Sequence, residues 1–145
     1  MRRVPKKSLY YRDGHHYLDG EDDEPFTGVG YFENAAGRLT AEIEYRDGLE
    51  WGKKREWDAS GNLSGEDTMW LGVMHGKNRE WFLNGQLAEE SDYEVGFLIR
   101  QKFWDENGNL TDFYEMQQED PEYKELQDYR NLYKDAPPIE DPLPY

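Results

Sequence analysis

The sequence predicts a mostly β protein: an antiparallel meander of stacked β-hairpin repeats, closed by one C-terminal helix. A repeated phrase carries the first half of this prediction, since REWDASGNL at 55–63 returns as REWFLNGQL at 79–87 and as KFWDENGNL at 102–110. Repetition of whole phrases is typical of architectures in which each unit packs against a copy of itself. After residue 116 the pattern changes, and a proline followed by apolar residues at helical spacing predicts the helix.

Residues 1–27 are expected to form N-terminal strands and an acidic loop that lead into the repeats. The YRDG of 11–14 duplicates the YRDG of 45–48, which indicates an incomplete unit ahead of the first full one. The acidic stretch DGEDDEPFTG at 19–28 then connects this unit to the repeats.

Residues 28–116 divide into four hairpin units, which run Gly28–Trp51, Gly52–His75, Gly76–Leu98 and Ile99–Met116. In each unit an aromatic residue ends the first strand, and NAAG, DASG, FLNG or DENG forms the turn. Glycine tolerates the positive φ of such a turn, and Asn or Asp side chains can accept hydrogen bonds from their own backbone. The second strand begins at a leucine and ends at a Tyr or Met an even number of residues later, so both point to one face. We expect Leu63 and Leu87 to be buried there.

Residues 117–136 are expected to form the helix, with Asp120 as N-cap and Pro121 as the first helical residue. Tyr123, Leu126 and Tyr129 fall on one face of it. We expect this helix to cover the exposed edge of the last strand, whose free backbone groups otherwise invite aggregation. The Pro-rich tail at 137–145 should be extended or loosely structured, and the whole chain should be one domain.

Composition limits the function. The 145 residues carry a formal charge of −15, which disfavours nucleic acid and anionic membranes and favours basic protein partners. Without cysteine there is no disulfide and no thiolate site. No signal peptide and no apolar run of membrane-spanning length is found, so we expect a cytoplasmic protein that is monomeric when free.

The segment YYRDG…EPFTG, followed by glycine-spaced units of EW–NG–L–E–Y–G type, resembles the YwqK family of bacterial antitoxins. Those proteins are built from a variant of the MORN repeat, a β-hairpin unit, and the resemblance extends from Leu9 to Met116. It implies four MORN-like repeats and a protein that neutralises a cognate toxin by direct binding. It implies no catalytic residue.

The candidate binding surface follows from strand alternation. Side chains an odd number of positions after each leucine point away from the leucine face, so the second strands should align their carboxylates in two columns. The predicted partner-binding residues are Glu42, Glu44, Glu66, Glu90 and Asp92, with Trp70 as an exposed aromatic anchor. Two alternatives stay open: Trp70 packs in the core, and the carboxylates form a solvated face partly neutralised by Lys53, Lys54, Arg55, Lys77, Arg79 and Lys102.

No enzyme, metal or cofactor is expected. A pair of carboxylates acts as general acid and base only when the two environments differ, and repeats produce equivalent environments. His15 and His16 point to opposite faces of a strand and lack a third ligand at recognisable spacing. The predicted function is therefore an antitoxin or immunity protein that binds a toxin, such as a basic nuclease- or deaminase-like domain, and occludes its active site. The alternative is a non-catalytic MORN-type scaffold that mediates protein assembly.

Overall fold

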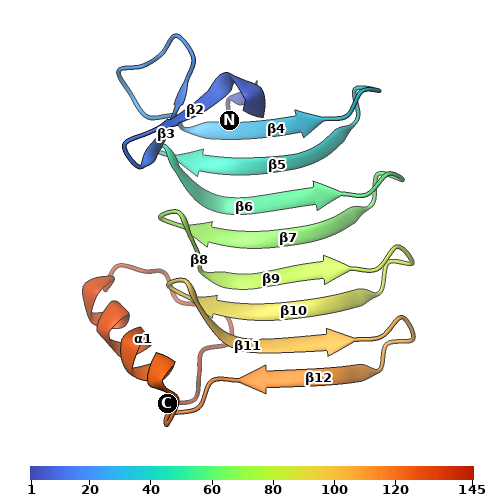
Figure 1. The fold of residues 1–145 in the computed structure, drawn as a ribbon, viewed down its shortest axis with the longest axis vertical. Helices are drawn as coiled ribbons and strands as arrows, with labels where there is room; N and C mark the ends of the chain where they lie inside the picture. The colour runs from blue at the N-terminus through green and yellow to red at the C-terminus, as the bar shows by residue number, and fades with distance from the viewer.

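Four β-hairpins follow one another and form a single long sheet, with one helix beside its C-terminal end (Figure 1). The structure is a computed structural model and describes residues 1–145. The sheet order is β1-β4-β5-β6-β7-β9-β10-β11-β12, with β8 paired to β7. All pairs are antiparallel except β1 with β4. The fold class predicted from the repeats is confirmed.

The strand bounds match the repeat units. The sheet strands are β1 (Arg3–Pro5), β4 (Gly28–Glu33), β5 (Leu39–Arg46), β6 (Leu49–Trp57), β7 (Leu63–Trp70), β8 (Val73–Met74), β9 (Gly76–Trp81), β10 (Leu87–Glu94), β11 (Phe97–Trp104) and β12 (Leu110–Glu115). The strands β6, β9 and β11 each end at the tryptophan of the repeated phrase.

The turns within the hairpins form as their sequences predict. Asp58 accepts hydrogen bonds through one carboxylate oxygen from the N–H groups of Ser60 (2.9 Å) and Asn62 (3.0 Å). Asn34 and Asp105 make the equivalent pair of bonds in their own turns. Gly61 has φ +84°, in the left-handed region that favours glycine. These bonds join only residues within one turn, so the three turns are stabilised locally.

Strand alternation gives the sheet two distinct faces. One carries Glu42, Glu66 and Glu90, and we call it the ladder face. The other carries Ile43 and Asp67, and we call it the opposite face. Each face is covered at one end only, by the segments that precede and follow the repeats.

The N-terminal segment covers the opposite face over the first strands. It consists of the short helix η1 (Lys6–Ser8) and the hairpin of β2 (Leu9–Arg12) with β3 (His15–Leu18). The small core here contains Val4, Leu9, Leu18, Phe26, Ile43 and Tyr45. The Tyr45 side chain is 2 % exposed, and burial followed by the charge of Glu50 raises the pKa of its hydroxyl, which has no hydrogen-bond partner.

The C-terminal segment covers the ladder face at the other end. Helix α1 (Pro121–Leu132) starts after Asp120 as predicted, although it is shorter than the predicted range. The Asp120 carboxylate accepts from the N–H of Gln117 (2.8 Å) rather than from the helix. Arg130 of the helix bonds Glu94 of β10 at 2.6 Å and 2.8 Å. The second core consists of Trp70, Val95, Ile99, Met116, Tyr123, Leu126 and Leu143.

Hydrogen bonds hold the tail after α1 against the ladder face. His75 is 5 % exposed, and its Nε2 lies 2.6 Å from the carbonyl of Pro137, while its Nδ1 accepts the N–H of Val95 at 2.9 Å. Nδ1 is thus the unprotonated nitrogen, so Nε2–H donates to Pro137. At the end of the tail, the Tyr145 hydroxyl donates to the carbonyl of Met116.

Two expectations about burial were wrong. Leu63 and Leu87 are half-buried, because the centre of the sheet is a single layer with no second layer over it. Helix α1 does not cover the edge of the last strand, and β12 is exposed over nearly its whole length. The apolar side of the helix packs instead against Trp70, Val95 and Ile99, where a core is available.

Candidate functional site

The ladder face carries a continuous row of alternating charge. The strand register sets an acidic residue of one strand opposite a basic residue of the next, from β5 to β11. The row runs Glu42, Arg55, Glu66, Arg79, Glu90, Lys102. Arg55 bridges two strands, with its guanidinium 2.8 Å from Glu66 and 3.6 Å from Glu42. Burial raises the pKa of Glu66, but Arg55 and Lys53 outweigh it and hold that pKa below its ordinary value.

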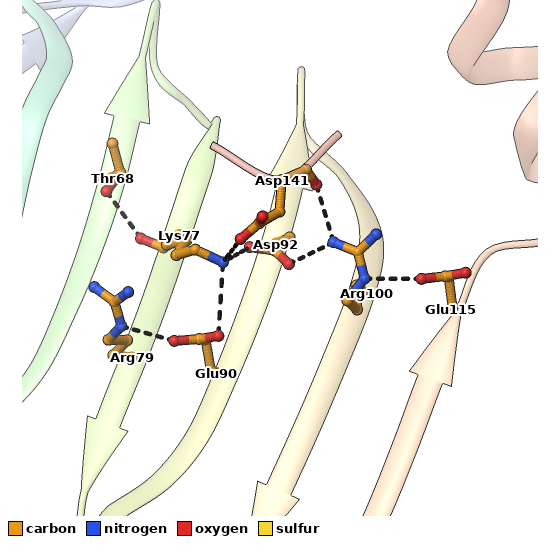
Figure 2. Close-up of polar contacts among 8 residues, drawn as sticks. All are labelled: Thr68, Lys77, Arg79, Glu90, Asp92, Arg100, Glu115 and Asp141. Carbon is orange, nitrogen blue, oxygen red and sulfur yellow. Dashed lines mark hydrogen bonds and ion pairs between the residues drawn. The ribbon is translucent and has the colours of Figure 1, made fainter. Parts of the chain in front are cut away.

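A second row of charged side chains lies beside the first, with Asp92 between Lys77 and Arg100 (Figure 2). Asp92 is 4 % exposed and accepts from Lys77 at 2.7 Å and from Arg100 at 2.8 Å. Asp141 of the tail reaches the same Lys77 ammonium at 2.7 Å, and Arg100 also bonds Glu115 at 2.8 Å. The ion pair between Asp141 and Lys77 therefore joins the C-terminal tail to this row.

These pairs correct the expectation of a free acidic face. The side chains of Glu42, Glu66 and Glu90 are 15 %, 16 % and 19 % exposed, and each is ion-paired with an arginine of a neighbouring strand. Glu44 accepts the backbone N–H of Lys53, and Asp92 is buried between two cations. The second strands do align these carboxylates in columns, but β6, β9 and β11, the first strands of the last three hairpins, lie beside them and carry the pattern basic-X-basic.

Trp70 is not the exposed anchor that one interpretation of the sequence expected. It is 7 % exposed and lies in the core beneath the helix. Its ring packs edge-on against Trp51 (6.1 Å between centroids) and Tyr133 (5.9 Å). The core alternative is therefore the correct one for this residue.

The uncompensated carboxylates lie on the opposite face. We call Glu56, Asp67, Glu80 and Glu89 the acidic patch. Its centre is Gly65, which pairs with Glu56 on one side and Glu80 on the other. Glu80 in turn lies directly across from Glu89, so two like charges face each other. Asp67 projects from the same face two residues along from Gly65.

Few cations reach the acidic patch. Lys54 is paired in register with Asp67, but its ammonium lies near Glu50 (3.4 Å). Glu89 accepts from the neutral Gln101 amide at 2.6 Å. Burial, followed by the charge of Glu89, raises the pKa of Glu80. Burial also raises the pKa of Asp67, against the opposing effect of Lys54. The patch thus holds more negative charge than its own surroundings compensate.

A hollow adjoins the acidic patch on the same face. It has a volume of about 170 Å³, and its lining includes Asp67, Glu80, Glu89 and Tyr93. Nothing crowds the space above Gly65, whose nearest neighbouring atom on that side is a backbone oxygen 3.9 Å from where a side chain would begin. The arrangement can receive a long cationic side chain from outside.

Sequence reasoning missed the acidic patch, although a signal was present. Glu56 and Glu80 belong to the two REW phrases, on the first strand of a hairpin, whereas the prediction placed carboxylates on second strands only. Each follows a basic ladder residue directly, so alternation sends it to the other face. The positions opposite them depend on register between units, which the sequence does not display.

No group of three or more His, Cys, Asp or Glu is arranged to hold a metal ion. Helix α1 is too short and too polar to cross a membrane, and there is no longer helix.

Comparison with known proteins supports the repeat. A family model described as a MORN repeat variant matches residues 74–94, from the end of β8 through β10. Residues 74–94 form a MORN repeat variant. The hairpins before and after this MORN repeat share its turns and its strand pairing, which supports a MORN-like repeat protein. No curated protein and no solved structure matches the chain.

Glu80 gives a direct test of the electrostatics. Glu80→Gln should stabilise the protein by about 0.5–1 kcal/mol at pH 7, because it removes a like charge opposite Glu89. A raised folded pKa means that an ionised Glu80 destabilises the fold above that pKa, and that this effect fades as pH falls through it. The gain should therefore vanish near pH 4. Urea unfolding at both pH values, with exposed Glu125→Gln as control, measures it; equal behaviour of the two variants would contradict it.

Proposed function

We propose that this protein is a non-catalytic antitoxin or immunity protein that binds a basic toxin domain and occludes its active site. The observation that carries the proposal is the acidic patch: four carboxylates on an uncovered sheet face with little local compensation. The MORN repeat fits the same role, because a repeat sheet presents a broad rigid surface. We place the encounter in the cytoplasm.

The physical basis is relief of repulsion. Glu80 and Glu89 repel each other in the free protein, and a Lys or Arg from a partner would remove that cost. The sheet holds the carboxylates in place beforehand, so binding orders little of this protein. A net charge of −15 steers a basic partner toward the surface, and this steering weakens as salt rises.

In this proposal the ladder face supports the structure instead of binding the toxin. Glu42, Glu66 and Glu90 already have cationic partners within the chain. An incoming cation would have to displace those pairs and would gain correspondingly less. The tail and helix also cover part of that face.

The test is co-expression with a basic toxin domain encoded in the adjacent gene, together with measurement of affinity. The patch variant combines Glu56→Lys, Glu80→Lys and Glu89→Lys. The control combines Glu122→Lys, Glu125→Lys and Asp128→Lys on the exposed side of α1. Each set removes three negative charges and adds three positive ones, so the formal net charge of both proteins changes from −15 to about −9.

We expect the patch variant to lose at least tenfold in affinity, and with it protection, while the control stays close to wild type. Equal loss in both would show that net charge alone matters, and equal retention would remove the acidic patch from the interface. If the wild type neither binds nor protects, the antitoxin function fails and a scaffolding role takes its place.

A further inference from the structure

Strand β12 is an open edge of the sheet. It pairs with β11 on one side and with nothing on the other (Figure 1). Five of its six residues are exposed. Leu110, Phe113 and Tyr114 remain 55 %, 51 % and 40 % exposed, which puts apolar surface on both faces of the edge.

The other edge of the sheet is protected against pairing. Strand β1 has three residues and includes Pro5, which cannot donate a backbone hydrogen bond. Strand β12 contains neither proline nor lysine, the residues that usually guard an edge. The two ends of the sheet therefore differ, and only the C-terminal edge is suited to receive a strand.

The outward backbone groups of β12 belong to Phe113 and Glu115. The N–H of Met116 bonds the carbonyl of Ile99, so alternation turns Glu115 and Phe113 away from β11. Two local bonds occupy part of this edge: Asp112 accepts the N–H of Phe113 at 2.8 Å, and the Gln117 side chain donates to the carbonyl of Glu115 at 3.0 Å. Both are bonds between near neighbours at the surface, which an added strand can replace.

The ladder specifies which side chains such a strand would need. Each basic strand within the sheet lies between two acidic ones, as Arg100 lies between Asp92 and Glu115. On β12, Glu115 has a cation on its inner side only. On the same face, Phe113 lies opposite Lys102 and is open on its outer side.

We propose that the outer edge of β12 binds an extended segment of a partner protein as an additional antiparallel strand. The segment carries Lys or Arg opposite Glu115 and, two residues later, Arg or Lys over the ring of Phe113. This is the basic-X-basic pattern of β6 and β9, continued by one strand from another chain. The inference concerns a surface separate from the acidic patch and does not rest on the proposed function.

The probe is a labelled, end-capped peptide with this chain's own residues 75–82, HGKNREWF, which contain β9. The matched control peptide exchanges the residues at positions 79 and 80, giving HGKNERWF. Its composition and charge are the same, but its two basic side chains no longer share a face. Fluorescence anisotropy gives the affinities, and backbone amide NMR shifts locate the binding.

Two protein variants test the edge. Phe113→Pro removes an outward N–H without removing a bond to β11 and leaves the net charge unchanged. Glu115→Gln removes the charge and keeps the size. Circular dichroism and thermal unfolding confirm that each variant is folded.

We expect wild type to bind HGKNREWF at least tenfold more tightly than it binds HGKNERWF. Phe113→Pro should bind HGKNREWF at least tenfold more weakly than wild type does. The NMR shifts should be concentrated at residues 110–117. Glu115→Gln should weaken binding three- to tenfold. Equal affinity for the two peptides, unchanged binding to Phe113→Pro, or no binding up to about 1 mM peptide would overturn the proposal. A concentration-dependent dimer that Phe113→Pro abolishes, without peptide binding, would assign the edge to a second copy and would also overturn it.

Discussion

Asp92→Ala should destabilise the protein by about 3–5 kcal/mol, the cost typical of removing one partner from a buried ion pair. Asp92 is 4 % exposed and is the carboxylate that Lys77 and Arg100 share. Its removal leaves Asp141 and Glu115 as the acidic partners at distances below 3 Å, so two partly buried cations face each other with less compensation. Urea unfolding measures the change.

The control for Asp92 is an exposed pair in the same protein. Glu21 bonds Arg2 at 2.7 Å, with side-chain exposures of 55 % and 52 %. Glu21→Ala should cost far less than Asp92→Ala, because solvent already screens that pair. If Asp92→Ala costs no more than Glu21→Ala, the charged rows do not stabilise the sheet.

Leu126→Ala should cost about 2–5 kcal/mol, as truncations of fully buried leucines do. Leu126 is 0 % exposed and packs in the core between α1 and the sheet. Leu87→Ala, in the half-buried centre of the sheet, should cost clearly less. Parallel denaturant titrations compare the two. An equal or larger effect for Leu87 would show that the stability of this protein lies in the middle of the sheet rather than beneath the helix.

The repeats made the strands predictable because every local signal agreed. The tryptophan, the Asn/Asp turn and the glycine recur in phase, and bonds such as those from Ser60 and Asn62 to Asp58 involve only residues within a turn. The burial of individual side chains was less predictable. In a single-layer sheet the side chains of the central strands stay half-exposed, even where apolar residues alternate regularly with polar ones. Whether Leu63 meets a second layer depends on where the terminal segments fold.

The terminal segments depend on contacts distant in sequence. Asp120 and Pro121 predict where α1 starts. They do not predict that Arg130 of the helix bonds Glu94, or that the helix packs against Trp70. The helix therefore leaves β12 open, contrary to the expectation that it would cover that edge.

For the candidate site, the sequence predicts the face on which a side chain lies but not its partners on the neighbouring strands. Alternation within a strand aligned Glu42, Glu66 and Glu90 on one face, as expected. Whether carboxylates are free or paired depends on the neighbouring strand, and the register sets Arg55 and Arg79 between these residues. On the opposite face the same register sets Lys54 beside Asp67 but brings Glu80 across from Glu89.

The central claim is that a basic partner docks on the acidic patch. Carbodiimide labelling of carboxylates, read by mass spectrometry in the free protein and in its complex with the toxin domain, tests it most directly because it distinguishes the two faces of one sheet. We predict that labelling of Glu56, Glu80 and Glu89 falls several-fold in the complex, while that of Glu122 and Glu125 is unchanged. Unchanged labelling of the acidic patch in a stoichiometric complex, with protection elsewhere, would contradict the account.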